Sequence, residues 1–430
     1  MADDDIITPE NPTILEPDPD VSTEPTLPMP DPTPSGEDIY EPTEPTLPFP
    51  TPNPADEEDE IYEENVELNP TEDTIDSLND LIIPPVIIPH GYVIGLHRSN
   101  FNESYAKAYS ILAISLGHIV ICFSSNDVNY DTKTINASVY DPKKDTFTIQ
   151  EFNYPDIIDN DVGYLNSELY NEFTLSNSIP FIYYPLGNKY KIYKRLSQIL
   201  HIKNYLLPFK RTKNPLEFLD FLKYYKTIIL KPIKNSNNNI IKLNYLNNGL
   251  ISVNDSNAIY IGNDNDLVNH ILVNILNNDL YDYILMQNVD FIINNKSFDI
   301  TFHVSRSFKK SWRIAASFAR YWLFKFNDVN KTDRFVIDNA MNFLMNYFND
   351  NSIGRLIFEQ MKSLSYLIAE RLQDFYPDHL INAISINFGI TSDQRIYILE
   401  VNSNPTTTWY QLDHALMHLQ YALYMVNPGL

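Results

Sequence analysis

All of the net negative charge of this chain lies in its first ninety residues. Residues 1–90 contain 25 Asp and Glu, no Lys or Arg, and 19 of the chain's 29 prolines. A segment of this composition buries too little apolar surface to offset the chain entropy that folding removes. We therefore expect residues 1–89 to form a disordered, acidic, proline-rich arm. In the remaining residues 31 acidic and 31 basic side chains balance, and these residues should form the folded body.

The arm contains a short internal repeat. Residues 23–30, TEPTLPMP, return as residues 43–50, TEPTLPFP. Proline at this density favours the extended polyproline II conformation, which can serve as a semi-rigid spacer or as a ligand for an aromatic groove. A spacer is the simpler interpretation, and docking of the repeated unit to a protein partner is the alternative.

The body is too long for one typical core and predicts two or three domains. The sequence opens with neither a basic nor an apolar segment, and no run of eighteen apolar residues follows, so we expect a cytoplasmic protein with no membrane contact. The single cysteine, Cys122, excludes an internal disulfide and is expected to be a buried structural thiol. The acidic balance argues against nucleic-acid binding through a general basic surface.

The first part of the body has the pattern of a small α/β domain. Strand patterns occur at residues 92–97, 119–123, 137–140, 147–152 and 180–184. A helix is expected at residues 102–116, ended by Gly117, and this strand–helix–strand order predicts parallel strands. Asp156 or Asp159 would end a further strand, where α/β domains bind ligands, and solvated loop carboxylates are the simpler interpretation.

A second unit begins near residue 188. A basic helix starts at Lys189, and a later helix has Asn214 as its N-cap and Pro215 at its first position. The buried strand 227–232 then carries Lys231, whose ammonium would serve as a point charge against a nucleotide phosphate. The polar loop 233–239 could fold over phosphates through its backbone N–H groups or could be a plain hairpin turn.

The last part of the body combines helices with a polar strand end. Two amphipathic helices are expected between residues 332 and 377, and a final helix is expected after residues 406–408. In residues 396–405, IYILEVNSNP, strand alternation places Glu400 and Asn402 on one face. Two oxygen donors on one face could form half of a site for Mg²⁺, and an ordinary solvated strand end is the alternative. Four histidines without metal-ligand spacing are expected to be structural or surface residues: His97, His118, His303 and His414.

Taken in order, these segments resemble the ATP-grasp fold, and the chain is similar to the YheC/YheD-like, endospore coat-associated family. The resemblance covers residues 92–426, and its most specific piece is EVNSNP at residues 400–405. It implies an α/β (α+β) fold class, with an ATP-grasp domain preceded by a small α/β pre-ATP-grasp domain. The implied boundaries are 1–89 for the arm, 90–187 for the pre-ATP-grasp domain, 188–286 for a nucleotide-covering subdomain and 287–430 for a C-terminal catalytic subdomain.

The resemblance also implies roles for residues around a bound ATP. Lys189 and Lys231 match the lysines that hold the nucleotide phosphates, and Gln287 matches the hinge residue beside the adenine pocket. Asp299 matches the aspartate of a Phe-Asp-Ile-Arg segment. Arg320 matches an arginine that faces the phosphates and the substrate, so that Arg320 and Lys231 would be the catalytic residues.

For the metal, Glu400 and Asn402 match Mg²⁺ ligands of the family. Asn387 stands where relatives have an acidic ligand, Thr301 replaces an arginine, and the loop 233–239 has none of the glycines expected there. Asparagine offers a carbonyl oxygen but no charge, so the resemblance predicts weakened binding of the metal.

The function that follows is an ATP- and Mg²⁺-dependent carboxylate–amine ligase, which forms an amide bond through an acyl phosphate on a peptide or amino-acid substrate. The three departures support an alternative, a catalytically reduced ATP-grasp protein that acts as a spore-coat or assembly component. In that case the arm would contribute to assembly, and the protein would be located in the spore coat.

Overall fold

The computed structural model describes most of the body and two residues of the arm. The described residues are 39–40, 91–98, 101–160, 167–184, 186–212, 214–233, 241–246, 249–254, 259–263, 283–293, 296–308, 311–322, 335–377, 379–403 and 409–428. The rest of the predicted disordered arm lies outside them, as do residues 234–239 of the predicted phosphate-covering loop.

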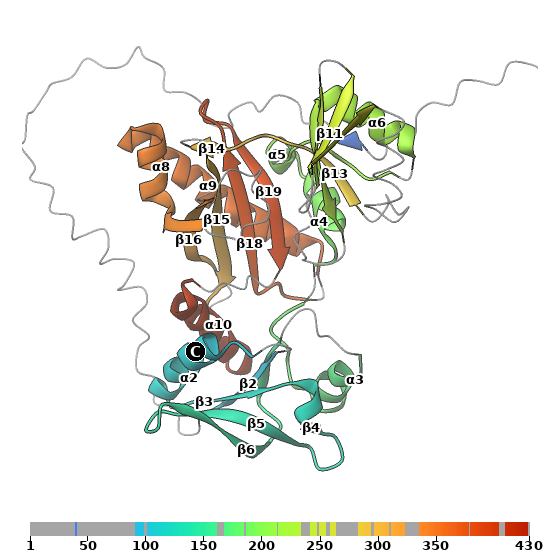
Figure 1. Ribbon diagram of the computed structural model, residues 1–430. Coiled ribbons are helices and arrows are strands. Elements are labelled where there is room, and N and C mark those ends of the chain that lie inside the picture. The colour runs from blue at the N-terminus through green and yellow to red at the C-terminus, as the bar shows by residue number, and fades with distance from the viewer. Residues whose placement is uncertain are drawn as a thin grey trace, which may run out of the picture. The chain divides into compact units, whose positions relative to one another are not determined.

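The first sheet of the body has the order β4-β5-β3-β2-β7, with β6 on β5, and is parallel only on the side formed by β3, β2 and β7 (Figure 1). Its elements are β2 (Val93–His97), α2 (Glu103–Ser115), β3 (Ile119–Phe123), η1 (Ser125–Asp127), β4 (Val128–Asn129), β5 (Thr134–Asp141), β6 (Thr146–Asn153), β7 (Ile157–Asn160), α3 (Ser167–Tyr170) and η3 (Asn171–Ser176). Strand β2 pairs in parallel with β3 and β7, as the strand–helix–strand order predicts. The prediction of parallel strands is wrong for β4, β5 and β6, which are antiparallel because short turns rather than a helix connect them.

The structure confirms the predicted ends of the helix at residues 102–116. The side chain of Asn102 accepts a hydrogen bond from the backbone of Tyr105 and begins α2, and Gly117 follows the helix with a φ of 83°. In the expected strand at residues 180–184, Phe181 forms an isolated bridge to Ile158. This segment follows the sheet edge without becoming a strand.

The second sheet is antiparallel throughout and has the order β1-β8-β13-β9-β10-β11-β12. Its elements are β1 (Ile39–Tyr40), α4 (Lys189–Ser197), α5 (Leu200–Lys203), β8 (Phe209–Lys210), α6 (Pro215–Tyr225), β9 (Thr227–Pro232), β10 (Ile241–Tyr245), β11 (Leu250–Asn254), β12 (Ile259–Asn263) and β13 (Tyr283–Gln287). Asn214 caps α6 and Pro215 begins it, as predicted. Phe218 and Leu222 of this helix pack against Ile228 and Leu230 of β9 in one apolar core.

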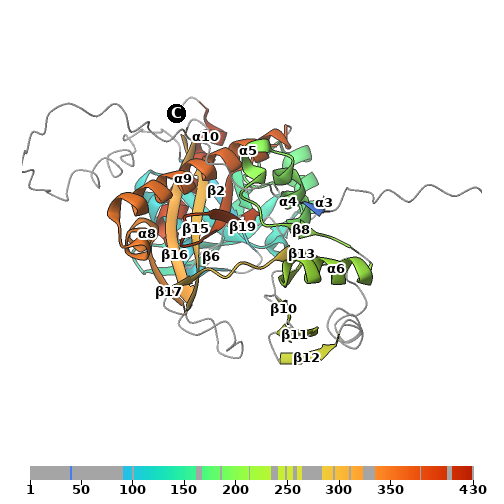
Figure 2. The same cartoon turned by 90° about the horizontal axis from the view of Figure 1, so that it is seen from above.

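The third sheet has the order β17-β16-β15-β18-β19, and β14 pairs with β15. Its elements are β14 (Ile292–Ile293), β15 (Lys296–Arg306), β16 (Trp312–Trp322), β17 (Phe335–Asn339), α8 (Ala340–Phe348), α9 (Asn351–Asp374), β18 (Ala383–Ile390) and β19 (Ile396–Ser403). The two predicted helices, α8 and α9, lie along one face of this sheet (Figures 1 and 2). The expected helical pattern began too early, because residues 335–339 pair with β16 and Asn339 then caps α8.

The last helix, α10 (Gln411–Val426), packs against α2 and β7 of the first domain and also contacts β15 and β16 of the third sheet. Ala415 and Leu419 share a core with Ile94 of β2 and Tyr109 of α2. The predicted cap at residues 406–408 lies outside the described residues. Among the residues that the structure describes, none of the helices is both long and apolar enough to span a membrane.

Candidate functional site

The two faces of β15 differ in polarity. Ile300 and Phe302 are fully buried in the core that α8 and α9 cover. Asp299 and Thr301 alternate with them and therefore point to the opposite face of the sheet. Neighbouring strands add polar side chains to this opposite face, which is where the predicted site residues of the third sheet are found.

Asp299 holds Arg320 directly across strands β15 and β16. The two residues are register partners, and Nε and Nη2 of Arg320 donate to the two carboxylate oxygens at 2.9 and 2.6 Å. Such a bidentate pair fixes the plane of the guanidinium. Burial alone would lower the pKa of Arg320, but the ion pair with Asp299 outweighs it and raises this pKa, so the guanidinium stays charged.

Glu400 on β19 is paired with Lys189 at the start of α4. Nζ of Lys189 lies 2.8 Å from Oε1 of Glu400, and about a quarter of each side chain is exposed. Lys189 is the first residue of α4, and the Asn188 side chain caps that helix by accepting from the backbone of Lys191. A predicted phosphate-binding lysine and a predicted metal ligand are therefore in direct contact.

A bulge in β19 connects Lys231 to this face. The pairing of β18 with β19 changes register after Asn387 and Glu400, which leaves Leu399 without a partner on β18. Nζ of Lys231, near the end of β9, donates a hydrogen bond of 2.8 Å to the carbonyl of Leu399. The hydroxyl of Tyr193 on α4 donates to the same carbonyl. One displaced carbonyl therefore joins β9, α4 and β19.

The charges of these groups influence one another. Burial lowers the pKa of Lys231, and the nearby Glu400 partly opposes this shift. Burial would raise the pKa of Glu400, but Lys231 and Lys189 outweigh it and lower this pKa. Burial raises the pKa of Tyr193 well above its ordinary value, so the phenol remains a hydrogen-bond donor. The result is an ionised carboxylate surrounded by cations.

The predicted metal ligands lie on neighbouring strands. Asn387 is the register partner of Glu400, and Oδ1 of Asn387 accepts a hydrogen bond of 3.3 Å from Thr301. Asn402 lies two residues beyond Glu400 and pairs with Ser385. In the described part of the chain no three His, Cys, Asp or Glu side chains gather into a metal cluster. One carboxylate with amide oxygens suits a Mg²⁺ ion that phosphates help to hold, because Mg²⁺ commonly uses one or two carboxylates.

Gln287 is the predicted site residue that lies apart from the cations. It ends β13, and its backbone N–H donates to the carbonyl of Pro208 at 2.9 Å. Lys231 is the register partner of Ile284, so Gln287 lies three residues, about 10 Å, further along the sheet. This separation would place Gln287 beside a different part of an elongated ligand.

Asp159 belongs to a buried network of polar and charged side chains outside this site, and the sequence indicated only part of it. The carboxylate of Asp159, fully buried at the end of β7, pairs with Arg98 at 2.7 Å and with Nδ1 of His418 at 3.1 Å. Nη1 of Arg98 also donates to the carbonyl of Asp159. The position of Asp159 at a strand end was visible in the sequence, but its partner on α10 was not. These contacts make Asp159 a structural residue that ties β7 to α10.

Sequence inspection also missed Tyr193 and Leu399 of the main site. Tyr193 has the pattern of an ordinary buried helix residue, and its contact with β19 spans 206 residues of sequence. Leu399 acts through its carbonyl, which every residue type provides. The sequence therefore gives no signal for either residue.

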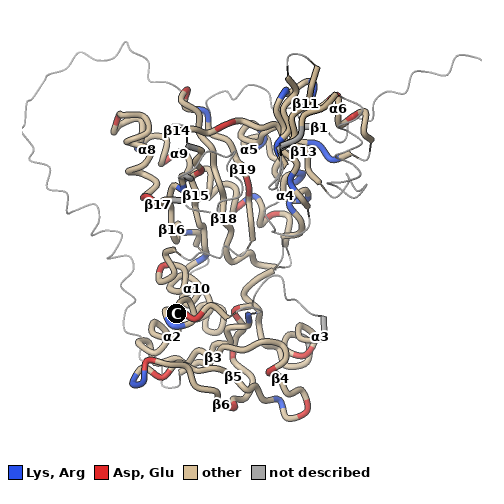
Figure 3. Tube along the Cα trace, in the orientation of Figure 1, with Lys and Arg blue, Asp and Glu red and all other residues tan. Residues whose placement is uncertain are grey.

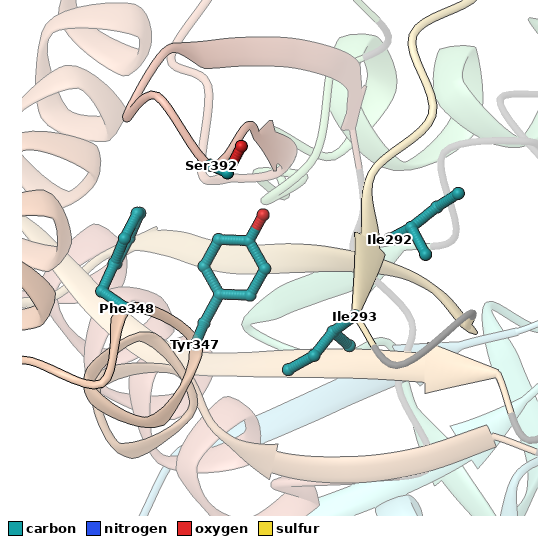
Figure 4. A pocket seen from close by; sticks show the side chains of 5 residues that line it. All are labelled: Ile292, Ile293, Tyr347, Phe348 and Ser392. Atoms are coloured by element: carbon teal, nitrogen blue, oxygen red, sulfur yellow. The ribbon is translucent and has the colours of Figure 1, made fainter.

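A shallow pocket lies apart from the charged groups (Figure 4). Its lining residues are mostly apolar and come from β14, the end of α8 and the turn after β18: Ile292, Ile293, Tyr347, Phe348 and Ser392. It contains no charged side chain among these residues. The pocket surface is about as polar as it is apolar, and its lining residues include none of the charged groups that the predicted chemistry requires.

The second and third sheets, with lysines facing a carboxylate-bearing strand, define an ATP-grasp protein. The chain belongs to the YheC/D-like ATP-grasp family, whose family model matches residues 178–425. This match confirms the ATP-grasp fold and the YheC/YheD-like family that the sequence predicts, and it does not test the association with the endospore coat.

Comparison with solved structures gives low sequence identity. The chain is similar to N5-carboxyaminoimidazole synthetase from Staphylococcus aureus complexed with ADP, at 10% identity and a TM-score of 0.43, covering 77% of each chain. It is also similar to D-alanyl-alanine synthetase A from Vibrio cholerae, at 12% identity and a TM-score of 0.41, covering 79% of this chain and 98% of that chain. The comparison with curated proteins gave no match.

Proposed function

We propose that this protein is an ATP- and Mg²⁺-dependent ligase that joins a carboxylate to an amine. The observation that carries the proposal is the convergence of Lys189, Lys231 and Arg320 around Glu400 and Asp299. Lys231 is 7% exposed, and its hydrogen-bond acceptor is a neutral carbonyl. A buried ammonium is costly without an anion, so an anionic ligand would stabilise this arrangement.

The proposed reaction takes place on a peptide or amino-acid substrate. A substrate carboxylate oxygen bonds to the terminal phosphorus of ATP, ADP leaves, and an acyl phosphate results. The amine of a second substrate then bonds to the acyl carbon, phosphate leaves, and the nitrogen loses a proton. Cations around the transferring group stabilise the negative charge on its oxygens, which supplies much of the catalysis in phosphoryl transfer.

Each residue has a distinct proposed task. Lys189 and Lys231 hold the phosphates, and Gln287 lies beside the adenine, about 10 Å along the sheet from Lys231. Arg320 stabilises the transferring phosphoryl group. Asp299 keeps the guanidinium of Arg320 in one plane through its two hydrogen bonds, so its task is positioning.

Three oxygen donors are proposed to hold Mg²⁺: Glu400, Asn402 and Asn387. When bound, the ion would neutralise charge on the phosphate oxygens. Lys189 occupies one carboxylate oxygen of Glu400, so nucleotide and metal would draw Lys189 toward phosphate and free that oxygen for the metal. We also propose that the boundary between the nucleotide-covering and catalytic subdomains lies near residue 287. Strand β13 ends there, and the strands that carry the proposed metal ligands follow.

Calorimetric titration with ATP at millimolar Mg²⁺ tests the proposal. We expect the wild-type chain to bind ATP and Lys231→Ala to lose this binding. In Glu400→Ala, ATP binding should no longer depend on Mg²⁺. The matched control is Glu217→Ala, because Glu217 also pairs with a lysine, Lys210 at 2.8 Å, but outside the site. A folded wild-type chain that binds no nucleotide would contradict the proposal, and release of ADP with panels of amino acids and amines would identify the substrates.

The alternative of a catalytically reduced coat or assembly component is less well supported. It rests on Thr301, on Asn387 and on the glycine-free loop 233–239, most of which lies outside the described residues. The convergence of Lys189, Lys231 and Arg320 favours the ligase. Location in the spore coat stays a prediction from the resemblance, and a protein partner for the arm stays a prediction from its proline-rich repeat.

A further inference from the structure

Two residues of the acidic arm form a strand of the body. In β1, Ile39 pairs with Lys210 and Tyr40 with Phe209, both antiparallel, along one edge of β8. Strand β13 occupies the other edge of β8. Without β1, the outer edge of β8 would leave backbone N–H and C=O groups unpaired, and such an edge readily accepts another strand.

The sequence segment that contains α4 and β8 is strongly basic. Residues 188–245 contain 13 Lys and Arg but only two Asp and Glu, whereas residues 1–90 contain 25 acidic residues and no basic ones. Figure 3 shows the blue Lys and Arg segments along α4. On that helix Lys191 and Lys194 are exposed, and α4 contacts β8 through the ring pair of Tyr193 and Phe209 at 5.5 Å. An acidic segment is therefore the electrostatic complement of this region.

The segment around β1 occurs twice in the arm. Residues 37–41 read Glu-Asp-Ile-Tyr-Glu, and residues 59–63 read Asp-Glu-Ile-Tyr-Glu. Both copies place an Ile-Tyr pair between acidic residues, and the first copy is the one paired with β8. Two adjacent residues of high strand propensity flanked by acids suit a short strand beside a basic surface.

We propose that the outer edge of β8 is a docking site for Ile39 and Tyr40 of the same chain, which stand between acidic residues in the sequence. Backbone hydrogen bonds to β8 supply the pairing, and the basic residues of α4 select an acidic segment. Residues 41–90 could span roughly 165 Å when fully extended, so the connection permits docking within one molecule. A tethered segment has an effective concentration on the order of millimolar, which favours it over free competitors.

This docking site is adjacent to the candidate active site. Phe209 of β8 contacts Tyr193, and the hydroxyl of Tyr193 donates to the Leu399 carbonyl that also accepts from Lys231. Docking is nevertheless independent of nucleotide chemistry. It can therefore be tested without substrate, and its failure would leave the ligase proposal unaffected.

The test is amide hydrogen exchange of the full chain, followed by mass spectrometry. The variant Ile39→Pro/Tyr40→Pro removes both backbone N–H groups of β1, and Ile61→Pro/Tyr62→Pro is the matched control in the second motif. We expect exchange in the peptide that contains Phe209 and Lys210 to become at least tenfold faster in the first variant. The control should exchange like wild type at every protein concentration.

A synthetic peptide of residues 33–44 provides a second measurement. It should bind the Ile39→Pro/Tyr40→Pro variant, and should bind the wild-type chain at least tenfold more weakly because the tethered motif occupies the edge. Unchanged exchange at β8 in the first variant would overturn the proposal. Equal effects of the two variants would also overturn it, because the second motif would then contribute equally. Protection that disappears on dilution would overturn it as well, because the strand would then come from another copy of the chain.

Discussion

Nζ of Lys231 donates a hydrogen bond of 2.8 Å to the carbonyl of Leu399, the residue that the bulge in β19 leaves without a partner on β18. Lys231 belongs to the second sheet and Leu399 to the third, so this one bond joins the two halves of the candidate site. The acceptor is a neutral oxygen. The bond therefore orients the ammonium but leaves its charge available to an anionic ligand.

Replacing Lys231 with methionine should weaken nucleotide binding by roughly 10- to 100-fold, since a hydrogen bond to a charged group contributes about 1.5–3 kcal/mol. The fold should be retained, because methionine keeps much of the apolar stem and removes a buried charge. Calorimetry with Mg²⁺ and ATP measures the change. Lys242→Met is the control, because Lys242 lies on β10, next to β9, and pairs with Asp290 at 2.7 Å. Equal losses of nucleotide affinity in the two variants would refute a specific role for Lys231.

The affinity for nucleotide should decline in alkaline solution at a lower pH than an ordinary lysine would cause. Burial lowers the pKa of Lys231, so its ammonium loses its proton, and its attraction for phosphate, below the usual lysine range. Titrations between pH 7 and pH 10 would locate the decline. Lys231→Arg keeps its charge over this range, so an identical profile in that variant would assign the decline to another group.

Asn387→Asp should strengthen Mg²⁺ binding by roughly tenfold, because a second carboxylate would stand directly across from Glu400 and hard cations are held largely by ligand charge. The change should appear as a lower Mg²⁺ requirement for ATP binding. Asn244→Asp adds the same charge on β10, where Asn244 contacts Ser252, and should leave this requirement unchanged. Weaker Mg²⁺ binding in Asn387→Asp would exclude residue 387 from the metal site.

Asp299→Asn should lower the free energy of unfolding more than Arg320→Lys, which removes only the bidentate geometry of the ion pair. Asp299→Asn leaves the guanidinium of Arg320 largely buried without its ion pair, and breaking such a pair costs about 3 kcal/mol. Arg320→Lys keeps one charge opposite Asp299 and should cost less. Urea unfolding measures both variants, and equal losses would contradict this prediction, because they would show that the bidentate geometry rather than the charge pairing provides the stabilisation.

Short local patterns predicted the strands that carry the candidate site but not how the site is joined together. Lys231, Glu400 and Asn387 lie on apolar runs whose alternation is visible in the sequence, and the structure brings these residues together. The bulge at Leu399 could not be foreseen, because a displaced carbonyl requires no particular residue type. Tyr193 could not be foreseen either, because its contact depends on how α4 packs.

In the fold, too, features set by neighbouring residues were predicted, whereas features set by pairing of distant segments were not. Asn102 and Asn214 were recognisable as helix caps because a cap acts within three residues. Residues 335–339 were expected to be helical, but pairing with β16 overrides their local pattern. The pairing of Ile39 and Tyr40 with β8 joins segments far apart in sequence, and two residues are too few to show a strand period.

Acid should destabilise this protein before its carboxylates titrate, because His303 and His414 contact each other in the core through Nδ1 and Nε2. Burial, with a further contribution from Arg320, lowers the pKa of His303 to about 3. Burial and the adjacent His303 lower the pKa of His414 well below its ordinary value. Both folded-state pKa values lie below the unfolded value of about 6.5, so the stability they contribute is complete above that pH and falls below it.

For each of these histidines the loss of unfolding free energy should steepen below pH 6.5 and approach about 1.4 kcal/mol per pH unit near pH 5. The double variant His303→Gln/His414→Gln should therefore have a shallower pH dependence near pH 5, by about 2.7 kcal/mol per pH unit, whatever its stability at neutral pH. Urea unfolding at half-unit pH steps measures the slope. The exposed His201 is the control, because His201→Gln should keep the wild-type slope. A double variant with the wild-type slope would mean that the pair is already protonated or solvated in the folded protein.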